Sequence, residues 1–196
     1  MKKCLYALLS ITSHSNVTGI GNDIKKITKM AHDYGIRVCV DACQTAGTHK
    51  FDSYTVDWAV FSGHKMYGPT GVGVLYSRHP YERYRTVRQG GGSVAHYDFN
   101  GNIEYYDGPA KHEVGTPNIA GILGMGVAAE WINFLGYDKM SEHFTNIDFA
   151  MSDTDIFNIK GLNLIYPTYR QNGRYVYSFT CDGFHPSDVS AFLGQD

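Results

Sequence analysis

The sequence predicts an α/β fold with a mostly parallel sheet, followed by the start of a small α+β domain. Short apolar runs at residues 37–40, 56–61 and 72–76 have the length and composition of buried strands. An amphipathic segment at 23–34 stands before these runs, and strands that alternate with helices are typical of parallel sheets. After about residue 153 the order changes to two strand-like runs and a short helix, which favours a second domain.

The elements of the first part follow from apolar periodicity and turn residues. Gly35 ends the amphipathic helix, because glycine adopts the left-handed conformation that closes many helices. Glycine and polar residues separate the strand-like runs, which predicts loops between them. The predicted elements are a strand at Cys4–Thr12, a helix at Asp23–Tyr34, and strands at Arg37–Val40, Val56–Phe61 and Val72–Tyr76.

The second part begins with a long irregular stretch. Residues 83–117 are rich in glycine and poorly periodic, and loops of this length are usually functional or interfacial. Pro117 and Asn118 then open a helix. The remaining predicted elements are helices at Ile119–Leu135 and Tyr137–Met151, antiparallel strands at Leu162–Tyr166 and Tyr175–Cys181, and a helix at Pro186–Phe192. We therefore divide the chain into residues 1–152, part of a large domain, and residues 153–196, part of a small C-terminal domain.

Composition and charge exclude several classes of protein. The chain is 43% hydrophobic and 18% charged, with a formal net charge of −2, so we expect neither nucleic acid nor a membrane surface as a partner. No run approaches the ~20 apolar residues of a membrane span. The four cysteines form no CxxC pair and no zinc-type spacing with histidine, which fits a reduced, cytoplasmic setting. A signal peptide at residues 1–9 is the weaker reading, since no small-residue cleavage site follows.

The most informative stretch is FSGHKMYGPTGVG, residues 61–73, which places Lys65 on a loop between two predicted strands. We expect partly apolar surroundings there, and burial would lower the pKa of the lysine and free its amine as a nucleophile. Ser62 and His64 add a hydroxyl and an imidazole N–H that suit a phosphate. A lysine that forms a Schiff base with pyridoxal phosphate (PLP) needs such a place. The alternative is an exposed lysine after a strand.

A second group of polar residues follows the strand at 37–40. Asp41 stands at its carboxyl end, with Gln44 three residues later. Ligands of open α/β sheets bind beyond the carboxyl ends of strands. A carboxylate there would hold a pyridinium nitrogen protonated, and Gln44 would donate to the ring oxygen. The alternative is that Asp41 caps a helix that begins near Thr45, and the two readings stay open at this point.

The motifs SHSNVTG, VDACQ, FSGHKMYGPTGVGVLY, GGGS and EVGTPN occur in this order along the chain. In that order they resemble the class V aminotransferase family of PLP enzymes, and within it the SufS-type cysteine desulfurases and selenocysteine lyases. The resemblance runs from about Leu5 to Asp196 and is strongest from Asn16 to Asn118. It implies that the sheet is part of the large domain of the fold type I PLP-dependent transferases.

The resemblance also implies roles for individual residues. Lys65 would form the Schiff base with the cofactor and move the proton of the substrate's α-carbon. Asp41 would pair with the pyridinium nitrogen. The other implied cofactor contacts are Asn16 and Gln44 at the ring oxygen, Ser62 and His64 at the phosphate, and Thr116 at the phosphate of the other subunit's cofactor. The role of Thr116 implies a homodimer with shared sites.

The implied activity is a cysteine desulfurase or a selenocysteine lyase. Such an enzyme converts L-cysteine to L-alanine, holds the sulfur as a persulfide for iron–sulfur cluster assembly and passes it to an acceptor protein, or it acts on L-selenocysteine. The resemblance further implies that the chain is the middle of a longer enzyme, without the nucleophilic cysteine, and that this fragment alone is inactive. The alternatives are a non-catalytic remnant and another class V activity, such as a kynureninase or an aminotransferase.

Some residues depart from the family's pattern or carry no function in this interpretation. Ser13 stands where the family usually has a histidine, with His14 displaced by one, and Ala42-Cys43 replaces a pair of glycine or alanine residues. We expect Cys4, Cys39 and Cys181 to be buried thiols. His32 and His143 are expected to face solvent from helices. The remaining histidines lack the spacing of metal ligands, so we expect no metal site.

Overall fold

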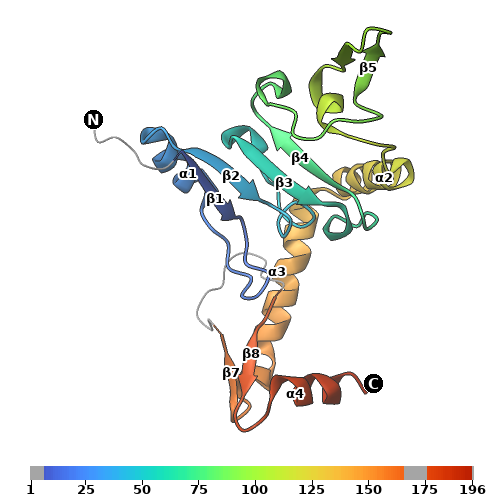
Figure 1. Cartoon of the computed structure of the whole chain (residues 1–196). Coiled ribbons are helices and arrows are strands. Elements are labelled where there is room, and N and C mark those ends of the chain that lie inside the picture. The colour runs from blue at the N-terminus through green and yellow to red at the C-terminus, as the bar shows by residue number, and fades with distance from the viewer. Residues whose placement is uncertain (1–6, 166–175, 196) are drawn as a thin grey trace.

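A four-stranded sheet forms the centre of the structure, a computed structural model that describes residues 7–165 and 176–195. The strands lie in the order β1-β2-β3-β4 (Figure 1). The first three are parallel and β4 is antiparallel to β3. Their bounds are Leu8–Thr12 for β1, Arg37–Asp41 for β2, Trp58–Ser62 for β3 and Gly73–Ser77 for β4. The predicted α/β fold with a mostly parallel sheet is confirmed.

Helix α1 (Ile24–Asp33) connects β1 to β2 and has the ends that the sequence predicts. The Asp23 carboxylate accepts a hydrogen bond from the Lys26 backbone N–H at 3.0 Å and so caps the first turn. Gly35 follows the helix with φ of 72°, a conformation that glycine adopts without steric cost. The chain can therefore turn directly into β2.

The two faces of the sheet differ in their cover. Val38 and Val40 of β2 and Ala59 of β3 are fully buried and pack with Ala31 of α1 in one cluster. Side chains alternate along a strand, so the neighbours of these residues point to the opposite face. On that face Leu75 is 55% exposed. Because parallel sheets are normally covered on both sides, this second face is an unusually open one.

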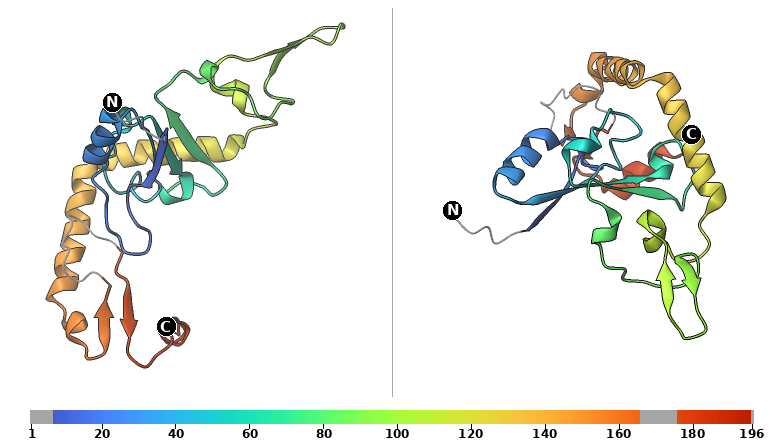
Figure 2. Two further views of the ribbon diagram at one scale, coloured as in Figure 1. Left: turned by 60° about the vertical axis from the view of Figure 1, so that its left-hand side comes forward. Right: turned by 90° about the horizontal axis from the view of Figure 1, so that it is seen from above.

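The stretch from 83 to 117, expected to be irregular, contains a β-hairpin. Strands β5 (Val94–Tyr97) and β6 (Ile103–Tyr105) pair antiparallel, with an irregular register near residue 95. Short 3₁₀ turns flank the hairpin at Tyr81–Arg83 and Gly108–His112. The expectation was wrong here because strands of three or four residues interrupted by a bulge show no clear alternation. Figure 2 shows the hairpin projecting from the β4 side of the sheet.

Two long helices follow the hairpin. Helix α2 (Ile119–Leu135) and helix α3 (Tyr137–Asp153) meet at Gly136, which has φ of 81°. Beyond α3 lie strands β7 (Leu162–Leu164) and β8 (Phe179–Cys181), paired antiparallel as predicted, and helix α4 (Pro186–Leu193). The expected strand ends at 166 and 175, and the start of the first strand before residue 7, lie outside the described residues. The division at residues 152 and 153 stays a prediction.

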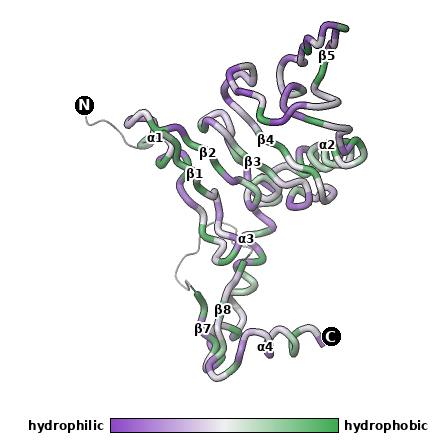
Figure 3. Tube along the Cα trace, viewed as in Figure 1, coloured by the Kyte–Doolittle hydropathy of each residue, from purple (hydrophilic) through white to green (hydrophobic). Residues whose placement is uncertain are grey.

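Apolar side chains remain on the surface of α2. Leu123, Val127 and Phe134 are 67%, 66% and 84% exposed, and the hydropathy colouring of Figure 3 shows apolar residues along this helix. Across the described residues, no single helix is long and apolar enough to cross a membrane. Helices α2 and α3 meet that test only together, as a pair bent by 77°.

A buried carboxylate joins β2 to β3 at the amino end of the sheet. Asp57 is 5% exposed, and its Oδ2 accepts hydrogen bonds from the Val38 backbone N–H and from His32 Nε2, both at 2.8 Å. Its Oδ1 accepts one from His79 Nε2 at 2.9 Å. Burial alone would raise the pKa of the Asp57 carboxyl, but these hydrogen bonds outweigh it and hold the pKa below its ordinary value. His32 is exposed as expected, and its ring also has a structural partner in Asp57.

The substitution Asp57→Asn is expected to destabilise the chain by about 1–3 kcal/mol, because an amide nitrogen cannot accept and leaves a buried donor unpaired. Urea denaturation at pH 7 measures the loss. The exposed Asp107, at the start of the turn Gly108–His112 and without a side-chain cap hydrogen bond, supplies the matched control Asp107→Asn, which is expected to change the stability by less than about 0.5 kcal/mol.

The effect of Asp57→Asn should also depend on pH with a defined sign. A carboxyl whose pKa is lowered by folding stabilises the fold fully above its unfolded pKa of about 4. That contribution is lost as the pH falls through the lower folded value. The difference between the original chain and Asp57→Asn should therefore be constant from pH 7 to 5 and shrink below pH 4. A difference that grows in acid would contradict the assigned hydrogen bonds.

Candidate functional site

Two neighbouring parallel strands end at the same edge of the sheet, and each ends on a candidate site residue. Asp41 is the last residue of β2 and Ser62 the last of β3. Asp41 pairs with Val60 in the register of the two strands. Ser62 lies two residues beyond Val60, so Asp41, Val60 and Ser62 project to the same face. In open α/β sheets ligands bind beyond such carboxyl ends.

The turn after β3 carries His64 and Lys65. It is a single 3₁₀ turn, η2 (Gly63–Lys65), in which the Gly63 carbonyl accepts hydrogen bonds from the N–H groups of Met66 and Gly68 at 2.9 and 3.0 Å. His64 and Lys65 are both exposed. The expectation that Lys65 is buried in partly apolar surroundings is wrong, because η2 projects beyond the covered face and the ammonium group keeps its water.

The turn after β2 packs directly against the turn that carries Lys65. A Cβ atom added to Gly47 would lie only 2.2 Å from the Lys65 carbonyl oxygen, so only glycine fits at this position. Gly47 is itself buried. The sequence interpretation did not include Gly47, and a single glycine within QTAGTHK was the only signal that could have pointed to it.

The Asp41 carboxylate is turned back onto its own loop. Its Oδ1 accepts a hydrogen bond from the Cys43 backbone N–H at 2.9 Å, an Asx-type turn. Residues 43–48 that follow are turns and no helix begins at Thr45. The alternative that Asp41 caps a helix is therefore wrong. Asp41 is exposed, and its position at the carboxyl end of β2 leaves the carboxylate accessible to a ligand.

Cys43 lies at the centre of the candidate site residues. Its Sγ accepts a hydrogen bond from the Ser62 hydroxyl at 3.1 Å and donates to the Val60 carbonyl at 3.8 Å. Burial raises the pKa of the Cys43 thiol, and the Asp41 carboxylate raises it further, while the Ser62 hydroxyl and the charge of Lys65 act in the opposite direction. Asp41, Ser62 and Lys65 thus all act on one half-buried sulfur atom.

The loop after β1 brings Asn16 to the same end of the sheet. The Ser13 backbone N–H donates to the Asp41 carbonyl at 2.8 Å, and its hydroxyl is hydrogen-bonded to Thr45. Asn16, three residues later, is exposed in a turn. Ser13 is 2% exposed, so the residue at the position where the family usually has a histidine serves to join two loops.

His14 occupies the space beside this junction. Its Nδ1 is 2.9 Å from the Thr45 hydroxyl oxygen, and its ring stacks on that of His49 with centroids 5.2 Å apart. His49 in turn stacks on Phe144 of α3 at 6.3 Å. Burial lowers the pKa of His14, and the neighbouring His49 lowers it further. This stack connects the loop that carries Asn16 with the turn that carries Gln44. Gln44 is half-buried.

Thr116 lies apart from the other candidate residues. It is exposed in the segment before α2, and within the described part of the chain it makes no hydrogen bond to them. Asn118, two residues later, donates from Nδ2 to the Gly71 carbonyl at 3.4 Å. The structure therefore brings together Asp41, Ser62 and Lys65, places Asn16 and Gln44 on adjoining loops, and leaves Thr116 outside the group.

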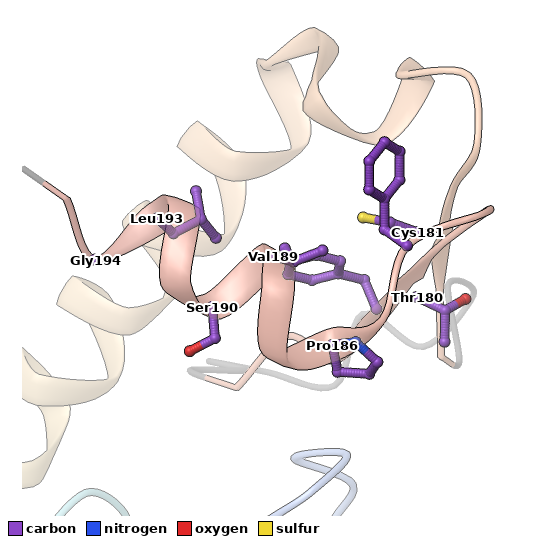
Figure 4. Close-up of a pocket in the computed structure, with 9 residues that line it drawn as sticks. Thr180, Cys181, Pro186, Val189, Ser190, Leu193 and Gly194 are labelled. Atoms are coloured by element: carbon purple, nitrogen blue, oxygen red, sulfur yellow. The ribbon is translucent and has the colours of Figure 1, made fainter.

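Two cavities of the described residues lie away from these side chains. One, of about 440 Å³, is apolar and lies between the covered face of the sheet and α2, with Phe61, Val74 and Met125 in its lining. The other, of about 530 Å³, lies between β8 and α4 (Figure 4). Cys181 lines it and is half-buried, as is Cys39, so neither thiol is as buried as expected. Cys4 lies outside the described residues.

The residues at the edge of the sheet offer a defined set of chemical groups. They comprise a primary amine from Lys65, a carboxylate from Asp41, a hydroxyl from Ser62 and a backbone turn rich in glycine. An amine suits an aldehyde, a carboxylate suits a pyridinium nitrogen, and hydroxyl and N–H donors suit a phosphate. This donor set fits PLP. No group of three or more His, Cys, Asp and Glu side chains in residues 7–165 and 176–195 could hold a metal ion.

Comparisons with known proteins agree with this arrangement. A cysteine desulfurase of Shigella sonnei is 36% identical over 190 residues, which is 95% of this chain and 46% of that protein. A cysteine desulfurase of the Escherichia coli strain K12 gives the same identity and the same coverage. The chain thus spans about half the length of the curated relatives it matches.

Solved structures give the same result for the fold. The crystal structure of a cysteine desulfurase from Escherichia coli matches with a TM-score of 0.78 and 30% identity, over 95% of this chain and 46% of that one. The apo cysteine desulfurase of Thermococcus onnurineus matches with a TM-score of 0.83 and 29% identity, over 95% and 47%. The family model for aminotransferase class-V matches residues 4–196. With the motifs, the sheet topology and this match in agreement, the chain belongs to the class-V aminotransferase family.

Proposed function

We propose that the chain forms part of a PLP-dependent cysteine desulfurase, which removes the sulfur of L-cysteine, leaves L-alanine and holds the sulfur as a persulfide. The observation that carries the proposal is the gathering of Asp41, Ser62 and Lys65 around one sulfur atom at the carboxyl ends of two parallel strands. The names of the relatives support the choice of reaction within the family.

In this proposal Lys65 and Asp41 have different roles at the cofactor. PLP supplies an electron sink for the electrons released at the substrate's α-carbon. The exposed Lys65 amine is free to bond to the aldehyde and to accept or return the α-proton. Asp41, whose Oδ1 accepts a hydrogen bond from the Cys43 N–H, would supply the negative charge that holds the pyridine nitrogen protonated. A charge held in place in advance needs no reorganisation during the reaction.

The proposal extends to partners. L-cysteine, or L-selenocysteine as the alternative substrate, would enter over the open face of the sheet. A sulfur-acceptor protein would take the product sulfur, and the setting would be the cytoplasm. Because Thr116 lies apart from the other candidate residues within its own chain, it is free to contact a second subunit. This fits a homodimer in which each subunit's Thr116 reaches the cofactor phosphate of the other.

The first test identifies the lysine that carries the cofactor. The chain is incubated with PLP, reduced with borohydride and digested, and the pyridoxyl label is located by peptide mass analysis. We expect the label on Lys65, because among the lysines of residues 7–165 and 176–195 it is the one that adjoins Asp41 and Ser62. Lys25, Lys26 and Lys50 serve as internal controls for surface labelling. A label distributed equally over all four would overturn the proposed site.

The second test removes the proposed partner of the pyridine nitrogen. In an enzyme of the relatives' full length that contains this chain, Asp41→Ala is expected to lower the rate of sulfide release from L-cysteine by about 100-fold or more, because a preorganised charge is lost at roughly 1.4 kcal/mol per tenfold. Labelling of Lys65 should change far less. The matched control is Asp52→Ala, since Asp52 also accepts a hydrogen bond from the backbone two residues on, at 3.1 Å, but lies outside the site. Similar turnover in both variants would leave Asp41 a purely structural role.

The third test concerns the contact between the two turns. Gly47→Ala places a Cβ atom 2.2 Å from the Lys65 carbonyl oxygen, which is too close for the present backbone, so the turn that carries Lys65 must shift. We expect borohydride labelling of Lys65 to fall at least about 10-fold, since small displacements of reacting groups cost large factors. Gly126→Ala in α2, where an added Cβ meets nothing within 4 Å, is the matched control and should label normally.

A further inference from the structure

The hydroxyl of Ser62 already donates a hydrogen bond within the chain. It donates to Cys43 Sγ at 3.1 Å, and the thiol donates to the Val60 carbonyl at 3.8 Å. A carbonyl oxygen only accepts hydrogen bonds, so the direction of this chain of bonds is fixed. The sulfur therefore offers its lone pair to Ser62, and the single proton of the Ser62 hydroxyl points to Cys43.

A phosphate group would require the same proton. The oxygens of a phosphate dianion carry no proton to donate, so Ser62 can bind them only as a donor. To do so its hydroxyl must rotate away from Cys43 and break the O–H···S bond. The thiol and the phosphate thus compete for one donor, and this competition exists only because position 43 carries a side chain with a lone pair.

We propose that Cys43 is a positioning residue that competes with the ligand's phosphate for the Ser62 hydroxyl and so sets the affinity of the site for phosphate-bearing ligands. The inference rests on the proposed function for the identity of the ligand. Cys43 contacts neither the substrate nor the reacting atoms in this role; it acts through Ser62. Asp41 and Lys65 lie near enough to influence the same sulfur, so the effect arises within the site itself.

The test compares two probes that differ only in the phosphate, PLP and pyridoxal. Dissociation constants are measured by absorbance titration for the full chain and for Cys43→Ala, Ser62→Ala and the double variant. Removing the thiol should lower the dissociation constant of PLP about 2- to 10-fold, the range expected for one hydrogen bond that no longer has to be broken. The affinity for pyridoxal should not change, and the gain in PLP affinity should vanish when Ser62 is already replaced by alanine.

Two further variants act as controls. Cys39→Ala removes another half-buried thiol, on β2, that makes no hydrogen bond to Ser62 within the described residues, and this variant should bind PLP like the original chain. Cys43→Ser restores an acceptor for the Ser62 proton and should return PLP affinity toward the original value. If Cys43→Ala changes the affinities for PLP and pyridoxal equally, the thiol acts only on packing and the inference is overturned. The same holds if Cys43→Ala changes the affinity for PLP equally with and without the Ser62 hydroxyl.

A second measurement needs no ligand. The Ser62 hydroxyl lowers the pKa of Cys43 by donating to its sulfur, so Ser62→Ala should move the pH profile of Cys43 alkylation by iodoacetamide to higher pH, with Cys39 as the internal reference. An unchanged profile would overturn the contact and the inference with it. If the profile shifts but neither PLP nor pyridoxal binds, the proposed function is what fails, and the inference that rests on it is withdrawn.

Discussion

The parallel pairing of β2 with β3 is the constraint on which the rest of the site depends. Because the two strands run in the same direction, their last residues, Asp41 and Ser62, meet at one edge. The register that pairs Asp41 with Val60 also brings Cys43, two residues beyond β2, next to Val60 and Ser62. An antiparallel pair would have placed the two ends at opposite edges, and the carboxylate and the hydroxyl could not share a ligand.

The same two strands are fixed at their other end by Asp57. One carboxylate oxygen accepts from the first buried N–H of β2, and the Asp57 backbone N–H returns a hydrogen bond to the Val38 carbonyl at 3.1 Å. His32 and His79 donate two further hydrogen bonds to the same carboxylate. A charge buried this deeply is tolerated only with several donors around it. The register of β2 and β3 is therefore fixed at both the amino and the carboxyl ends of the two strands, which gives the candidate site a rigid base.

The open face of the sheet explains why the site residues are more exposed than the sequence suggested. Helix α1 and the apolar contacts of Phe61 and Val74 toward α2 cover one face. The other face, which carries Asp41 and Ser62, keeps Leu75 more than half exposed. Lys65 is therefore exposed although apolar strands precede and follow its turn. Its proposed role depends on access and on nearby charge, since the described residues provide no apolar enclosure for it.

By itself the sequence determined most of the elements and their chemistry. The four strands of the central sheet, the helix ends at Asp23 and Gly35, and helices α2 and α4 follow from local periodicity and capping, which are properties of a few neighbouring residues. The hairpin of β5 and β6 does not, because its strands are too short to show a pattern. The family followed from motifs in a fixed order. Only the tertiary structure decided which of these groups touch. Gly47 against the Lys65 carbonyl, Ser62 on Cys43, and Asp57 between His32 and His79 each join residues 18 to 25 positions apart. Such contacts depend on strand register and loop packing, and no local pattern of apolar or polar residues encodes them.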